Sequence, residues 1–316
     1  MCGLAGLLYK QERGEGALGA PILTMLDVLG SRGVDGTGVA LYGPASRDRM
    51  VARVRLGGSD DRRAQADRVV QRAAAIGRVA SADVQDDYLR LEMSSNRDAA
   101  ELAAAIEGPD LGVLVFSLGQ RMEIVKQVGP ARMLRERYGL DCFRGTHGIG
   151  HTRLATESRV DVAHCHPFWA RPFPDIAVVH NGQLTNYHKM RRRFEMRGVR
   201  FYTENDSEFI AIYLAHKLAA GVSLEDAMKD SLEELDGTFT YLVSTPEGIG
   251  LARDAFATKP MVIAETDQWV ALASEEVALR RAIREPFDTE EPSARTIRVW
   301  RHPGVAAALT PVGAGV

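Results

Sequence analysis

Short apolar runs separated by polar turns are the feature of this sequence that most restricts its fold. Each run has the length of a β-strand and is too short for a long buried helix. Two helical patterns interrupt them, at 206–220 and 223–235. Strands joined by turns, with helices in pairs, indicate an α+β protein with stacked antiparallel sheets. The runs lie at 148–154, 176–180, 239–244, 248–252, 261–264 and 269–273.

The first 42 residues continue this pattern. Residues 2–9 predict a short strand at the centre of a sheet, because nearly all of them are apolar or small. Residues 21–32 place Ile22, Met25, Leu26 and Leu29 on one helical face, and Gly33 is the expected stop. The next strand is expected at 36–42.

The pattern of short apolar runs gives way to helical patterns between residues 45 and 144. Helices are expected at 62–75 and at 96–107, the second with Asn96 as N-cap, and a buried strand at 111–117. No constellation of reactive side chains appears here. We interpret residues 45–144 as a long helical insertion that elaborates the fold or contacts a partner. The whole chain, 2–316, is then one domain, with a loose Gly/Ala/Pro-rich tail after residue 303.

Composition excludes several classes of protein. The net charge of −3 gives no general attraction to nucleic acid. No apolar run approaches the roughly 20 residues of a membrane helix, and no signal peptide is apparent. Three cysteines cannot make a disulfide framework, which favours a reducing cytoplasm.

Cys2 stands where N-terminal chemistry is available. An initiator Met before a small residue is normally removed, which would expose an α-amine on the cysteine. That amine has a pKa of roughly 7.7–8.0, so it can accept the thiol proton near neutral pH. Position alone leaves chance as an alternative, so the hypothesis requires an oxyanion hole and a substrate clamp elsewhere in the chain.

Five short segments meet that requirement together. In this order along the chain they resemble the class II glutamine amidotransferases, whose glutaminase domain is an N-terminal nucleophile hydrolase. The resemblance runs from Cys2 to about Glu275 and leaves 45–144 unmatched. It implies a four-layer αββα sandwich and hydrolysis of L-glutamine through a cysteine thioester. The segments are MCG at 1–3, RGVDGTG at 32–38, GHTRLAT at 150–156, HNG at 180–182 and NDSE at 205–208.

Asn181 and Gly182 are the candidate oxyanion hole. Hydrolysis of an amide builds negative charge on a tetrahedral oxygen, and donors must be aimed at it. The Asn181 side chain offers an N–H₂ group and Gly182 an unshielded backbone N–H, and the resemblance gives both positions this role. The alternative is an Asn-Gly hairpin turn after a strand that ends at His180.

Arg153 and Asp206 are the candidate clamp for the amino-acid end of glutamine. A guanidinium can grip the α-carboxylate with two hydrogen bonds, and a carboxylate suits the α-ammonium. The resemblance adds Thr156 as a further carboxylate contact. The alternatives are a surface ion pair for Arg153 and a helix N-cap for Asp206.

Two further features have weaker assignments. Arg32 and Asp35 match a turn that supports the nucleophile in the family, although Val34 stands where the family commonly has proline. His164 and His166 alternate on one face and could share a metal ion, but no third and fourth ligand follow at a suitable spacing, so we expect no metal site.

The resemblance also implies how the ammonia is used. The chain is most like the stand-alone glutaminase-like subunit of N-methylglutamate synthase and of glutamate-synthase-related systems. The expected partners are L-glutamine and synthase subunits resembling parts of glutamate synthase. Flavin and iron–sulfur clusters would belong to those subunits, and no cofactor is expected in this chain. Two alternatives stay open: a non-catalytic glutamine- or glutamate-binding subunit, and an N-terminal-cysteine amidase for another substrate.

Overall fold

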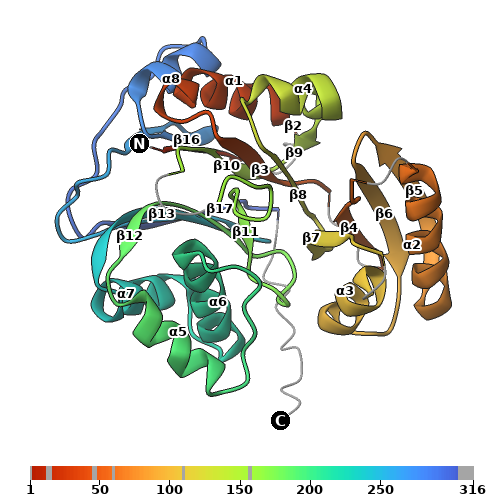
Figure 1. Cartoon of the computed structure of the whole chain (residues 1–316). Helices are drawn as coiled ribbons and strands as arrows, with labels where there is room; N and C mark the ends of the chain where they lie inside the picture. Colours follow the sequence, from red (N-terminus) through yellow and green to blue (C-terminus); the bar gives the residue numbers. More distant parts are fainter. Residues whose placement is uncertain are drawn as a thin grey trace.

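Two large antiparallel sheets form the body of the protein (Figure 1). The computed structural model describes residues 2–11, 16–44, 48–58, 61–108, 111–155 and 159–304. The six-stranded sheet has the spatial order β15 (Val262–Glu265), β16 (Trp269–Ala273), β1 (Gly3–Tyr9), β10 (His147–Arg153), β3 (Gly36–Tyr42) and β8 (Met122–Gln127). The five-stranded sheet has the order β11 (Phe168–Trp169), β12 (Ala177–Leu184), β13 (Gly237–Thr245), β14 (Gly248–Arg253) and β17 (Ile297–Arg301).

Helices cover the outer face of each sheet, which gives four layers (Figure 1). On the six-stranded sheet lie α1 (Gly19–Leu29) and α8 (Glu276–Ala282), with α4 (Arg132–Tyr138) beside α1. On the five-stranded sheet lie α5 (Tyr187–Glu195), α6 (Asp206–Ala219) and α7 (Leu224–Glu234). The predicted stacked antiparallel sheets are therefore confirmed. Among the helices in the described ranges, none is both long and apolar enough to cross a membrane.

Residues 50–119 form a separate small-sheet unit at the β8 edge of the body (Figure 1). The predicted helices are present as α2 (Arg62–Ile76) and α3 (Ala99–Glu107), although Asp98, not Asn96, caps α3 by accepting from Glu101 N. They pack on a four-stranded sheet that the sequence analysis did not predict. Its spatial order is β5 (Arg78–Gln85), β6 (Tyr88–Ser94), β4 (Met50–Arg55) and β7 (Leu114–Gly119).

The expectation of a mainly helical segment was therefore wrong. The outer strand β5 is largely exposed and mostly polar or small, so it has no apolar alternation to reveal it. The body also resumes earlier than residue 144. Directly after β7 the chain enters β8, which pairs with β3, and then forms α4, the turn η2 (Leu140–Cys142) and β9 (Arg144–Gly145), which pairs with β2 (Gly16–Ala17).

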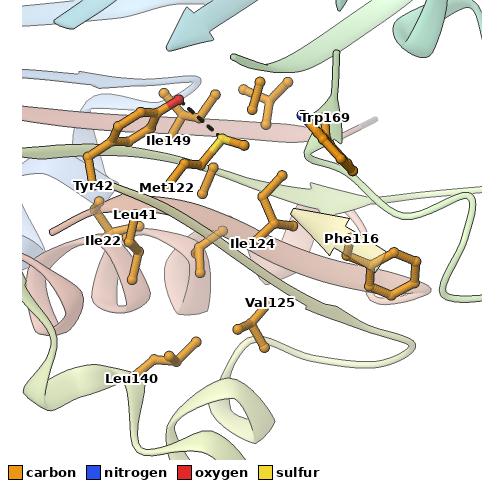
Figure 2. Packing of buried hydrophobic residues seen from close by; sticks show 14 of the residues in the cluster. Ile22, Leu41, Tyr42, Phe116, Met122, Ile124, Val125, Leu140, Ile149 and Trp169 are labelled. Atoms are coloured by element: carbon orange, nitrogen blue, oxygen red, sulfur yellow. Dashed lines mark hydrogen bonds between the residues drawn. The ribbon is translucent and has the colours of Figure 1, made fainter. Parts of the chain in front are cut away.

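One hydrophobic core joins the body and the small-sheet unit. Ile22 of α1, Ile124 of β8 and Phe116 of β7 belong to the same buried cluster, with Trp169 at its edge next to the second sheet (Figure 2). Burying apolar surface is the dominant stabilising contribution to folding. The small-sheet unit is therefore packed against the body and is not a freely tethered lobe.

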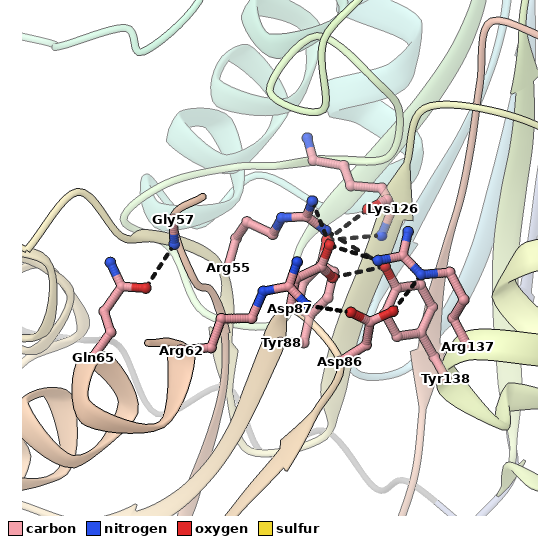
Figure 3. Close-up of polar contacts among 10 residues, drawn as sticks. All are labelled: Arg55, Gly57, Arg62, Gln65, Asp86, Asp87, Tyr88, Lys126, Arg137 and Tyr138. Atoms are coloured by element: carbon pink, nitrogen blue, oxygen red, sulfur yellow. Dashed lines mark hydrogen bonds and ion pairs between the residues drawn. The ribbon is translucent and has the colours of Figure 1, made fainter. Parts of the chain in front are cut away.

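Ion pairs stabilise one side of the interface between the small-sheet unit and the body, which we call the seam (Figure 3). Asp87, in the turn between β5 and β6, is 3% exposed. Its carboxylate lies 2.6 Å from Arg55 Nη2 and 2.9 Å from Arg137 Nη2 of α4, and it accepts from the Tyr138 hydroxyl at 2.8 Å. The Tyr88 hydroxyl donates to Lys126 O of β8 at 2.7 Å. The turn of the small sheet is thus fixed to two elements of the body.

Candidate active site

Cys2 lies at the start of the central strand β1, beside the ends of two other strands. Gly3 is opposite Thr152 of β10, and Gly36 of β3 is opposite Arg153. The pairing therefore brings the ends of all three strands together at one end of the sheet. The Cys2 sulfur is 3.4 Å from Leu154 N, which donates to it. Met1 lies outside the described residues.

Two side chains hold the carbonyl oxygen of Cys2. Arg32 Nε donates to it at 3.0 Å and Asn181 Nδ2 at 3.1 Å. Arg32, at the end of the turn η1 (Gly30–Arg32), also pairs through Nη1 with Glu275 Oε1 at 2.5 Å. The first residue of the predicted site is thus anchored from the six-stranded sheet's side by Arg32 and from the facing sheet by Asn181.

The turn after Arg32 supports the end of β10. Asp35 N donates to Arg153 O at 2.9 Å, and Asp35 Oδ2 accepts from Ala155 N at 2.8 Å. A Cβ at Gly33 would lie 2.5 Å from the Arg153 carbonyl carbon, so only glycine allows this approach. The supporting role predicted for Arg32 and Asp35 has a physical basis in these contacts, whereas Glu275 was missed because a lone Glu carries no sequence signal.

Asn181 and Gly182 lie inside strand β12, so the predicted hairpin-turn alternative was wrong. The strand continues to Leu184, with Asn181 opposite Thr240 and Gly182 opposite Phe239 of β13. Gly182 has φ +142°, and a Cβ there would lie 2.1 Å from Thr238 O. The position therefore requires glycine in a strand that is closely paired with its neighbour.

The backbone N–H of Gly182 points away from β13. Its partner on β13 is Phe239, whose N–H donates to the Asp254 carboxylate and whose carbonyl accepts from Asp254 N, both on the β14 side. Such a residue faces its β12 neighbour as a non-hydrogen-bonded pair. Leu184, two residues on and on the same edge, donates its N–H to Asp206 Oδ2 at 2.9 Å. Gly182 N–H and Asp206 are therefore directed to the same edge of β12.

Asp206 is the first residue of α6 and not its N-cap, which corrects the predicted alternative. Asn205 is the N-cap, and its side chain accepts from Ser207 N at 2.9 Å. Burial opposes ionisation of Asp206, but the interactions with His180, whose Nδ1 is 3.5 Å from Oδ1, and with the Leu184 N–H outweigh it. The pKa of Asp206 is held below its ordinary value, so this carboxylate is charged at neutral pH.

A group of buried histidines lies behind Asp206. The Ser207 hydroxyl is 2.9 Å from His180 Nδ1 and 2.8 Å from His166 Nε2. His151 stacks on His166 with 3.9 Å between ring centroids. Burial lowers the pKa of His151 to about 3 and that of His166 well below its ordinary value, so both rings are neutral. His166 thus engages Ser207, while His164 bonds Asp161 at 2.7 Å.

Arg153 is 3% exposed at the end of β10, so the predicted alternative of a surface ion pair was wrong. Its Nη1 donates to Arg159 O at 2.9 Å. Thr156 itself lies outside the described residues. Lys126 Nζ donates to the carbonyls of Ala163, Cys165 and Pro167, and burial lowers the Lys126 pKa to about 8.

The residues gathered at this edge combine a thiol, a side-chain amide, a buried guanidinium and an ionised carboxylate. A thiol beside amide donors can attack a carbonyl group, and a fixed cation with a fixed anion can orient a zwitterionic amino acid. His180 and Ser207 were not predicted as members of the site. Ser207 lies within the NDSE segment and His180 directly precedes Asn181, so both adjoined the predicted residues without a pattern of their own.

Comparison with known proteins agrees with this chemistry. Residues 151–281 match the glutamine amidotransferase domain family. The chain is 38% identical over 307 residues to a Methanothermobacter thermautotrophicus protein named "Putative glutamine amidotransferase", covering 95% of this chain and 99% of that protein. It is 37% identical to the glutamine amidotransferase-like protein GlxB of Rhizobium meliloti, over 96% and 99% of the two chains. The chain belongs to the glutamine amidotransferase family.

The fold comparison identifies the architecture. The glutamine phosphoribosylpyrophosphate amidotransferase of B. subtilis superposes with a TM-score of 0.58 at 18% identity, over 95% of this chain. This chain spans about half, 49%, of the length of that structure. The fold of this chain is therefore shared with that amidotransferase structure, and the predicted four-layer αββα sandwich is confirmed.

Proposed function

We propose that this protein hydrolyses L-glutamine to glutamate and ammonia with Cys2 as nucleophile. The observation that carries the proposal is the double anchor on the Cys2 carbonyl from Arg32 and Asn181, which fixes a cysteine beside the buried Arg153. An anchored backbone restricts where the sulfur can move. Restriction of a nucleophile to a near-attack position is a large contribution to catalysis.

The reaction proceeds in two halves. With Met1 removed, the Cys2 α-amine accepts the thiol proton, and the sulfur attacks the side-chain carbonyl of glutamine. The oxyanion is stabilised by Asn181 and Gly182. The side-chain amide of Asn181 has two N–H donors, so one can hold Cys2 O while the other serves the oxyanion. The tetrahedral adduct collapses to a thioester as the protonated Cys2 amine gives its proton to the leaving nitrogen, which departs as ammonia. Water then hydrolyses the thioester, which releases glutamate and restores the thiol.

Substrate recognition rests on Arg153 for the α-carboxylate, with Thr156 as the further carboxylate contact that the resemblance implies, and on Asp206 for the α-ammonium. His180 and Ser207 act as positioning residues, because their hydrogen bonds fix the Asp206 carboxylate. Asp206→Asn should weaken use of glutamine and hardly alter binding of an analogue that lacks the α-amine. An equal loss for both ligands would remove Asp206 from the clamp.

The proposal also holds that a partner subunit uses the ammonia. The resemblance to glutaminase-like subunits of N-methylglutamate synthase favours a synthase subunit that resembles part of glutamate synthase and carries flavin and iron–sulfur clusters. The small-sheet unit supports it, because none of the proposed catalytic or substrate-binding residues lies in that unit. Glutaminase activity of the purified chain should rise some 5- to 150-fold when its co-purifying subunits and their acceptor are added. An unchanged rate would indicate a free-standing amidase.

The nucleophile can be tested by intact-mass spectrometry with a glutamine-shaped diazoketone. The wild type should lack Met1 and gain one adduct. Cys142→Ala is the matched control, because Cys142 is an exposed free thiol that would report unspecific labelling, and it should label like the wild type. Cys2→Ala should gain no adduct and lose glutaminase activity by at least about a thousandfold. Labelling that persists in Cys2→Ala, or activity with Met1 retained, contradicts the mechanism.

A further inference from the structure

A cavity of about 430 Å³ lies between the small-sheet unit and the six-stranded sheet. Its walls come from β4, β6, the start of β8 and the residues after β3. Gly43, at this end of β3, lines it, whereas Gly36 at the other end of β3 is opposite Arg153. The cavity is therefore at the far end of β3 from Cys2, and its occupant would not touch glutamine.

Positive charge predominates in the lining of this cavity. Two glutamates, Glu92 and Glu123, stand against five arginines, an excess of three formal positive charges. A volume of this size suits a small metabolite. The arginines are Arg49, Arg53, Arg90, Arg121 and Arg144.

The two glutamates are already engaged by arginines. Glu123 accepts from Arg53 Nε at 2.7 Å and from Arg90 Nε and Nη2 at 2.9 and 3.0 Å. Glu92 accepts from Arg90 Nη1 at 2.6 Å, and this bond lowers the Glu92 pKa. The carboxylates therefore orient the guanidinium groups without cancelling the excess charge.

Arg53 is the buried cation of this lining with donors open to the cavity. It is 5% exposed, and its Nε is committed to Glu123. Within the described part of the chain, its two terminal amino groups donate to no protein acceptor. These amino groups are not among the buried polar atoms that lack a partner, so they are open to the cavity, and a guanidinium fork matches carboxylate and phosphate oxygens. Arg49 lies at the rim with its side chain 55% exposed.

We propose that this cavity binds a small anion carrying two or more negative charges on phosphate or carboxylate groups. Arg53 binds it from the floor and Arg49 from the rim. The ligand would bridge the small-sheet unit and the body, since Arg53 lies on β4 while Glu123 and Arg121 belong to β8 and the residue before it. The proposal does not depend on glutaminase activity.

The test is isothermal titration calorimetry of the full chain with inorganic pyrophosphate and, separately, with citrate, which distinguishes phosphate from carboxylate ligands. At least one should bind saturably, with one site. Arg49→Gln should weaken that binding about tenfold, the loss of one charge-assisted contact. Arg53→Gln, checked for folding by circular dichroism, should abolish it. Arg68→Gln, an exposed arginine on the outside of α2, is the matched control and should bind like the wild type.

Other outcomes overturn the proposal. Absence of saturable binding by either probe would do so, as would binding that Arg49→Gln leaves unchanged or that Arg68→Gln weakens equally. If Arg53→Gln does not fold, the Arg49→Gln titration still decides the question, because Arg49 is largely exposed and its replacement removes only a 3.4 Å contact with Glu92, which keeps its shorter bond to Arg90. Binding of an acidic peptide alone would assign the cavity to a protein partner instead.

Discussion

Between the two large sheets the buried polar side chains include neutral histidines, whereas at the interface with the small-sheet unit they are mainly arginines and carboxylates. His147, His151 and His166 have pKa values lowered by burial. Asp87 and Glu123 each accept from arginines. The first junction also holds Arg153 and the ionised Asp206, two charges that a zwitterionic ligand can complement. Ion pairs at the second fix one unit against another.

The largest expected effect is on the substrate charges of the first junction. Arg153→Lys keeps the positive charge but loses the two-point grip, so glutamine hydrolysis should fall sharply. Loss of a buried charged contact typically costs about 2–5 kcal/mol. Steady-state kinetics with glutamine will measure it, with the exposed Arg68→Gln as control. Near wild-type kcat/KM in Arg153→Lys would show that no bidentate contact is made there.

The next effect concerns the seam. Asp87→Ala removes the carboxylate that Arg55, Arg137 and Tyr138 share, so the free energy of unfolding should fall by about 3 kcal/mol. Thermal denaturation measures the loss. Lys229→Gln, which breaks an exposed ion pair with Asp226, is the control and should leave Tm unchanged. Equal Tm values for all three proteins would mean that the ion pairs do not hold the small-sheet unit.

Acid should weaken the first junction. His147 and His151 have pKa values of about 3 in the folded protein, below the ordinary value of 6.5, so the unfolded chain binds their protons first. Their stabilising effect is present above about pH 6.5 and is lost as the pH falls toward 3. Unfolding free energy should drop by about 1 kcal/mol per pH unit for each such histidine. Urea denaturation at several pH values measures the slope.

His147→Gln provides the comparison for that slope. His147 bonds Thr146 and Thr245 O and stacks on Tyr42, away from Cys2. The variant is less stable at pH 7 but should lose less stability on acidification than the wild type. An identical slope would assign the acid sensitivity to other groups.

The smallest expected effect lies at the Cys2 anchor. Glu275→Gln removes the charge that pairs with Arg32 but leaves Arg32 Nε on Cys2 O. Because the Glu275 side chain is 35% exposed, solvent screens the pair, and glutaminase activity should fall only a few-fold. A loss as large as that of Arg153→Lys would make the Arg32–Glu275 pair part of the substrate site.

The sequence predicted the sheets of the body because their strands are short apolar runs with clear stops. It did not predict β5, whose residues are mostly polar and exposed, nor that Asn181 and Gly182 continue a strand. An Asn-Gly pair is a strong local turn signal, and only the pairing with β13 overrides it. Local preference therefore failed where a neighbouring strand determines the backbone.

The candidate site was predicted from reactive residues in a fixed order along the chain. These residues were Cys2, Arg32, Arg153, Asn181 and Asp206. The supporting groups were not predictable in this way. Ser207 joins two histidines from separate segments, and Glu275 reaches Arg32 from 243 residues away. Such contacts depend on tertiary packing and have no spacing that a sequence pattern could reveal.

The backbone of Gly182 has a consequence for genetic variation. Every single-nucleotide missense change of a glycine codon introduces a side chain, and at this position any Cβ would meet Thr238 O at 2.1 Å and Phe239 Cα at 2.7 Å. No amino acid one mutation away can preserve the conformation at φ +142°. No single-nucleotide missense change at codon 182 should therefore be neutral. Such alleles should behave as loss-of-function alleles even when the rest of the chain is unaltered.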